Sequence, residues 1–237
     1  MRAYGLAFFL LAGSTMAQIK GNGTIDPSSI YGVPSSAVVS TAELEVPERA
    51  RKELRHANEL LVKQDYLHAL KRLNQAITIY PAYPDAYNNL AVVYAQLGDL
   101  VREREALEQA IRLNDHFALA HLNLGRMHIA SADFVGAEAE LEKAASLNPP
   151  EPVTLILLAY TELMEGHLDD VMFTTRKAHA LRTPHAFAHR LAARALERRN
   201  QLDRAIAELQ LSLSEESAGP RAEAARNELK ILNGLTH

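Results

Sequence analysis

A stretch of 34 residues, from Pro84 to Phe117, most constrains how this chain can fold. Apolar side chains in its first half recur at spacings of three and four residues, which puts them on one face of an α-helix. Gly98 and Asp99 interrupt this pattern, because glycine suits the left-handed position after a helix and aspartate can accept hydrogen bonds from the next helix's free amides. A second apolar face follows from Leu100 to Ile111. Two short helices joined by a tight turn cannot bury these faces alone, so neighbouring copies of the unit are expected.

The unit does recur, in consecutive 34-residue frames that align without a gap: 50–83, 84–117, 118–151, 152–185 and 186–219. The eighth residue of every frame has a small side chain: Ala57, Ala91, Gly125, Ala159 and Ala193. The twenty-seventh residue is also small: Ala76, Ala110, Ala144, Ala178 and Ser212. Small side chains at two fixed places predict that the helices of each pair approach most closely there.

This period and this placement of small residues resemble the tetratricopeptide repeat (TPR) family. The resemblance extends over about 170 of the 237 residues. It implies an all-α fold, a right-handed superhelical solenoid of about five antiparallel helix pairs with a C-terminal capping helix. It also implies a concave groove that binds an extended peptide or a partner protein, and a scaffold rather than an enzyme.

The residues outside the frames have a different character. Residues 1–17 are predicted to be a secretory signal peptide, because Arg2 precedes a mostly apolar segment and Thr15-Met16-Ala17 offers a cleavage site. The alternative is an uncleaved membrane anchor, but the apolar segment is well short of the ~20 residues that a spanning helix needs. The predicted organisation is therefore a signal peptide at 1–17, a flexible tether at 18–46, five repeats within 47–219, and a capping helix and tail at 220–237. We expect an exported protein, periplasmic or secreted.

Composition and motifs narrow the possible functions. The chain has no cysteine, which excludes disulfides and thiolate metal sites. Its formal net charge of −4 lacks the basic excess that is typical of nucleic-acid binders. The sequence contains no phosphate-binding glycine loop, nucleophile elbow, zinc-protease motif or dinucleotide fingerprint. We expect no catalysis, cofactor, metal or nucleic acid, and a protein or peptide as the partner.

The TPR resemblance implies that the first helix of each pair lines the groove. Its residues give the predicted binding surface: Asn58, Asn88, Asn89, Asn123, Arg126, Ile156, Tyr160, Leu163, Arg190 and Arg194. Asparagine amides both donate and accept, so they suit the backbone of an extended peptide. The alternative interpretation is that these asparagines set helix packing. Leu54 and Leu119 stand where family members that grip a peptide's terminal carboxylate have lysines, which argues against that mode of binding.

Histidines support a second hypothesis. His121, His128 and His189 occupy positions where the second frame has tyrosines, and we interpret them as core residues between paired helices. His185 and His189, four residues apart, are a possible chelating pair, although Pro184 places His185 at the start of a helix. The chain would then be a histidine-using metal-binding protein or an enzyme accessory subunit in the cell envelope. A third hypothesis is a structural spacer in an envelope complex.

Overall fold

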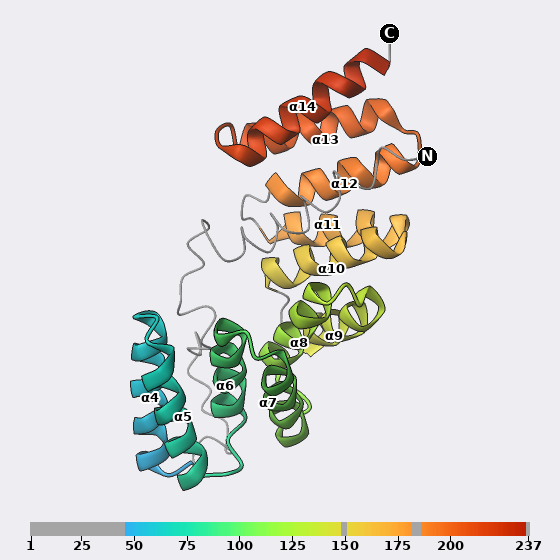
Figure 1. The fold of residues 1–237 in the computed structure, drawn as a ribbon. Helices are drawn as coiled ribbons and strands as arrows, with labels where there is room; N and C mark the ends of the chain where they lie inside the picture. The colour runs from blue at the N-terminus through green and yellow to red at the C-terminus, as the bar shows by residue number, and fades with distance from the viewer. Residues whose placement is uncertain (1–45, 148–150, 182–185, 236–237) are drawn as a thin grey trace. The chain divides into compact units, whose positions relative to one another are not determined.

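The structure is a computed structural model that describes residues 46–147, 151–181 and 186–235. The predicted signal peptide, all of the predicted tether except Val46, and His185 lie outside the described residues. The described part of the chain contains eleven helices and no strand (Figure 1). Their bounds are α4 (Glu48–Val62), α5 (Tyr66–Ile79), α6 (Pro84–Leu97), α7 (Leu100–Leu113), α8 (Ala118–Ala130), α9 (Phe134–Leu147), α10 (Pro152–Glu165), α11 (Leu168–Ala180), α12 (Ala186–Arg198), α13 (Leu202–Glu215) and α14 (Pro220–Leu235).

Each 34-residue frame supplies one helix pair, which confirms the all-α prediction and its period. The five pairs are α4 with α5, α6 with α7, α8 with α9, α10 with α11, and α12 with α13. The sixth frame start, Pro220, begins α14, which packs against α13 as expected of a capping helix. None of the helices in the described ranges combines the length and the hydrophobicity that a membrane crossing needs.

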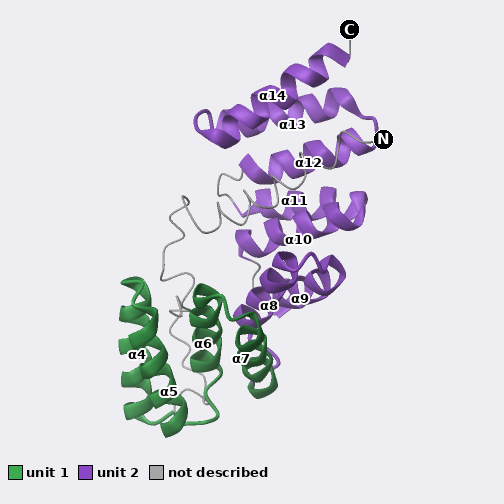
Figure 2. Ribbon diagram, in the orientation of Figure 1, with its two compact units in different colours: residues 1–113 green, residues 114–237 purple. Residues whose placement is uncertain are grey.

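The chain divides into two compact units, residues 1–113 and 114–237 (Figure 2). In the first unit, α5 packs against α4 and α6, and α6 packs against α7. In the second unit each helix from α8 to α14 packs against the next one along the chain. The first helices of successive pairs also meet there, because α10 contacts both α8 and α12.

In every pair, one residue in the turn between the two helices has a positive φ. Gly98 and Gly166 adopt left-handed backbone conformations, with φ of 76° and 88°, at the C-terminal ends of α6 and α10. The fifteenth residue of the other three frames also has positive φ, 58°, although it is not glycine: Gln64, Ala132 and Asn200. Asp99 accepts a hydrogen bond of 3.1 Å from the amide of Arg102, which confirms its predicted role at the start of α7.

The small residues at frame positions eight and twenty-seven lie in the core, as predicted. All ten are buried. At Gly125 the two helices are so close that an added Cβ would lie 2.7 Å from Cγ of Leu141 on the partner helix. The α8–α9 pair therefore has no room for even a methyl group at this position, which explains the one glycine among four alanines.

Candidate binding surface

In the second unit, the ninth frame position forms a row along three neighbouring first helices. It contains Arg126 on α8, Tyr160 on α10 and Arg194 on α12, and all three are half-buried. Because α10 contacts both α8 and α12, a tyrosine lies between two arginines on one face of this unit. Ile156, one turn before Tyr160 on α10, is also half-buried and packs against the same core cluster.

The Tyr160 ring rests on an apolar base. It meets Phe134 of α9 edge to face, with ring centroids 6.3 Å apart and planes at 73°. Burial raises the pKa of Tyr160, and the positive charge of Arg194 partly opposes that shift. The phenol therefore stays neutral at physiological pH, and Tyr160 as a whole is only half-buried.

Two arginines of the predicted binding surface, Arg190 and Arg194, already contact a carboxylate. Arg190 is buried, and its Nη2 lies 3.5 Å from Oε1 of Glu228 on α14. Arg194 forms an ion pair with the same oxygen. Any acidic ligand group at this end of the surface would compete with Glu228.

The asparagines of the first unit bond to one another. The Asn89 amide donates to Oδ1 of Asn58 at 2.7 Å, which joins α6 to α4. The Asn88 amide donates to Oδ1 of Asn89 at 3.2 Å, and Asn88 is fully buried. These bonds are the arrangement expected from the packing interpretation. In the second unit Asn123 and Leu163 are also buried, at 9% and 4% exposure.

Two histidines at the fourth frame position lie between paired helices. His121 Nδ1 is 2.6 Å from Glu140, and His189 Nδ1 is 2.7 Å from Glu208. In both cases the carboxylate is on the second helix of the same pair, nineteen residues later. The first pair has the reversed version, in which Arg72 donates to Glu53 at 3.0 Å. The core position of these histidines was predicted, but their acidic partners were not, although polar residues nineteen apart recur at these two positions of the frames.

The fourth pair contains a buried ionisable group that the apolar sequence of α10 does not predict. Glu162 on α10 is 3% exposed, and Thr174 on α11 donates to its Oε1 at 2.7 Å. Desolvation raises its pKa to about 7, and the negative charges of Asp170, Glu138 and Glu142 act in the same direction. At neutral pH this carboxyl group is poised between its protonated and ionised forms.

Family comparisons agree with the helical frames. Sequence models described as TPR repeat or tetratricopeptide repeat match residues 57–98, 84–117 and 104–152. The second match has the same bounds as the second frame. The chain is a tetratricopeptide repeat protein.

Solved structures of other TPR proteins share the fold. MamA aligns with a TM-score of 0.63 and 18% identity, over 72% of this TPR protein and 93% of MamA. YrrB, a TPR protein with an unusual peptide-binding site, aligns with a TM-score of 0.65 and 19% identity, over 78% and 96% of the two chains. PilF of Pseudomonas aeruginosa aligns with a TM-score of 0.66 and 17% identity, over 78% of this TPR protein and 89% of PilF. At these identities the likeness concerns the fold, and no curated protein matches this TPR protein by sequence.

Proposed function

We propose that this TPR protein is an exported, non-catalytic scaffold that binds an extended segment of a partner protein on the first helices of its second unit. The observation that carries the proposal is the row of Arg126, Tyr160 and Arg194 on α8, α10 and α12. It combines a partly exposed aromatic ring with cations on both sides.

The chemistry of this row indicates the kind of segment that fits. Tyrosine and arginine, together with tryptophan, are enriched at interface hot spots, because each offers a large contact area together with polar groups. Tyr160 and Ile156 would contact an apolar side chain of the segment. Arg126 and Arg194 would favour acidic residues on either side of it, with Arg194 exchanging Glu228 for the ligand's carboxylate. The segment is therefore apolar at its centre and acidic at its flanks.

The fold supports the scaffold part of the proposal. TPR proteins present stacked helices as binding surfaces, and the related structure of YrrB is described as having a peptide-binding site. The absence of the common catalytic motifs from the sequence supports a role without catalysis.

The test begins with co-purification from a native extract and identification of the partner by mass spectrometry. Peptides that tile the partner are then measured by fluorescence anisotropy against the purified chain. Tyr160→Ala should weaken binding of the best peptide about 30-fold, the effect of losing a hot spot of about 2 kcal/mol.

Phe173→Ala is the matched control for this variant. Phe173 belongs to the same repeat and is 54% exposed, but it lies on the second helix, α11. Peptide binding should be unchanged in this variant. If Tyr160→Ala binds like the parent and Phe173→Ala does not, the binding surface is on the second helices. An extract that yields no partner would favour the structural spacer.

Export is the other part of the proposal, and it rests on the apolar segment and the Thr15-Met16-Ala17 site of the sequence. The mature chain should begin at Gln18. Intact-mass measurement of the protein from its native source checks this, and a mass that includes residues 1–17 would contradict export with cleavage.

A further inference from the structure

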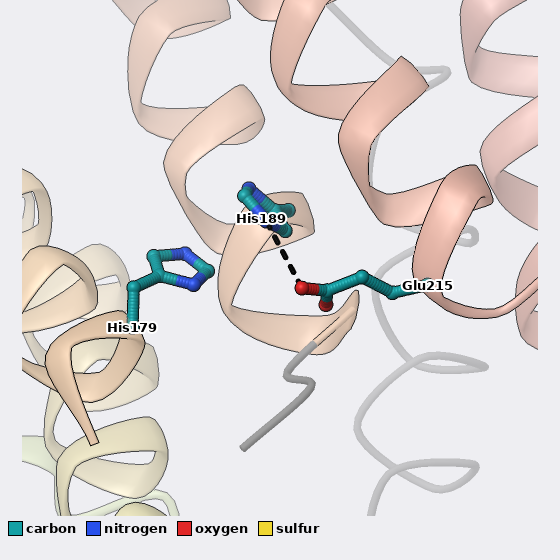
Figure 3. Close-up of side chains that lie close together, drawn as sticks. All are labelled: His179, His189 and Glu215. Carbon is teal, nitrogen blue, oxygen red and sulfur yellow. Dashed lines mark ion pairs between the residues drawn. The ribbon is translucent and has the colours of Figure 1, made fainter. Parts of the chain in front are cut away.

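Three potential metal ligands converge where α11, α12 and α13 meet in the second unit. They are His179 near the end of α11, His189 in the first turns of α12, and Glu215 at the end of α13 (Figure 3). One ligand atom from each lies within 4.8 Å of the other two. The two imidazole rings have centroids 4.0 Å apart and planes tilted by 33°, and His189 Nε2 is 3.6 Å from Glu215 Oε1.

The repeat pattern shows that two of these residues are exceptions. His179 is the twenty-eighth residue of its frame, which is apolar in the other four: Ile77, Ile111, Ala145 and Leu213. Glu215 is the thirtieth residue, which is apolar in the other four: Ile79, Leu113, Leu147 and Leu181. Packing of the repeat therefore requires neither a histidine nor a glutamate at these positions. Each departure occurs once, in adjacent repeats, and the fold brings both departures to His189.

The hydrogen bond between His189 and Glu208 prepares the imidazole for metal binding. A carboxylate only accepts hydrogen bonds, so the 2.7 Å contact places the proton on Nδ1 of His189. The lone pair of the neutral ring is then on Nε2, the nitrogen nearer Glu215. A carboxylate that holds the far nitrogen of a histidine ligand is the usual second layer of zinc sites, where it fixes the ring and increases its basicity.

We propose that His179, His189 and Glu215 bind a zinc ion, with Glu208 as the positioning residue for His189. Two imidazoles and one carboxylate are a ligand set that zinc accepts in four-coordinate sites, and they leave one position for water or a partner's side chain. Ligand atoms around a tetrahedral zinc are about 3.4 Å apart, so the present separations must shorten by about 1.4 Å at most. This shortening requires the side chains of His179 and Glu215, which lie near helix ends, to rotate.

Two of the three ligands are accessible, and charges of both signs surround them. Glu215 is exposed, and His179 lines a pocket of about 250 Å³ together with Glu208 and Ala192. Three arginines line the same pocket, but each has a contact of its own. Arg199 pairs with Asp169, Arg176 donates to the Met172 carbonyl, and Arg204 donates to Gln201. Of the three, only Arg199 is paired with a carboxylate, so Arg176 and Arg204 keep their positive charge at the pocket, while Glu208 and Glu215 supply the carboxylates that contact His189.

The experiment titrates ZnCl₂ into the untagged full chain, previously stripped of metal with EDTA, by isothermal titration calorimetry. One zinc ion per chain should bind, Mg²⁺ should not, and excess zinc should raise the melting temperature. His179→Ala and Glu215→Leu restore side chains that other frames have at these positions, so both variants should fold. Each should weaken zinc binding at least tenfold, and Glu208→Gln should weaken it about tenfold through its effect on His189.

His121→Gln is the matched control, because His121 has the same frame position and the same kind of glutamate contact as His189. The positions that correspond to His179 and Glu215 are occupied there by Ile111 and Leu147, which cannot bind a metal. It should bind zinc like the parent. His185→Ala separates this site from the pair suggested by sequence spacing, and it should also bind like the parent. Failure to bind one zinc ion, or parental affinity in both His179→Ala and Glu215→Leu, would overturn the site. Far-ultraviolet circular dichroism without metal verifies that each variant is folded.

Discussion

The fourth helix pair, α10 with α11, and the fifth pair, α12 with α13, share one frame pattern. They differ in whether their buried ionisable side chains lie next to a group of opposite charge. The first helix of the fourth pair is the most apolar by sequence, yet it buries Glu162, where the fifth pair has Leu196. The fifth pair is the most charged by sequence, yet its buried His189 and Arg190 each lie beside a carboxylate. The number of charged residues in a repeat therefore says little about the cost of folding it.

The partners of each charge make the difference. Thr174 donates to one oxygen of Glu162, and the other oxygen has no hydrogen-bond partner among the described residues. The charges that act on Glu162 are all negative, so folding favours its protonated form. In the fifth pair, Glu208 faces His189, and Glu228 faces two arginines. Opposite charges there offset part of one another's desolvation, although Arg190 Nε and Glu228 Oε2 also have no hydrogen-bond partner among the described residues.

The largest expected effect is on the pH dependence of the fourth pair. Burial raises the pKa of Glu162 from 4.5 to about 7, so the folded protein holds a proton that the unfolded chain releases above pH 4.5. Stability is therefore lost as the pH rises through this window, by about 3 kcal/mol at most. Glu162→Gln keeps an acceptor for Thr174 but cannot ionise. It should be more stable than the parent by up to that amount at pH 8, and nearly equal to it at pH 4.5.

Urea denaturation of both proteins at pH 4.5, 6 and 8 measures this difference. Thr175→Val is a suitable control, since the Thr175 hydroxyl bonds to the Val171 carbonyl of its own helix rather than to Glu162. Its stability relative to the parent should not change with pH. A Glu162→Gln protein that is less stable than the parent at pH 8 would show that the ionised carboxylate has a favourable partner in solution.

Most of the fold could be predicted from the sequence, because the 34-residue period records helix packing directly. Small residues at positions eight and twenty-seven and the Gly98-Asp99 break identify the helix pairs and their turn. The non-glycine turn residues were not predicted. Ala132 adopts positive φ, which its side chain disfavours, because the packing of α8 on α9 determines the turn between them.

The candidate binding surface was predictable only as a set of positions. Frame position indicates which residues lie on the first helices, but it does not reveal burial or partners. Asn88 is fully buried, and Arg194 pairs with Glu228, a residue 34 positions later. The proposed zinc ligands were missed for a related reason. His179 and Glu215 are 36 residues apart, so local spacing pointed to His185 instead, and only the comparison of frames reveals the exceptions.

The smallest expected effect is on the fifth pair, and it has the opposite sign. Glu208→Gln should destabilise the protein by about 1 to 2 kcal/mol at pH 8, because a hydrogen bond to a charged acceptor becomes one to a neutral acceptor. The cost is limited because the Glu208 side chain is 25% exposed and partly solvated.

Glu140→Gln tests the same contact in the third pair, where the Glu140 side chain is 27% exposed and faces His121, and an equal loss is expected. Denaturation in the presence of EDTA keeps metal binding out of the measurement. If either variant gained stability, as Glu162→Gln is expected to do, the histidine contacts would not compensate the desolvation of their carboxylates, and the contrast between the two pairs would be wrong.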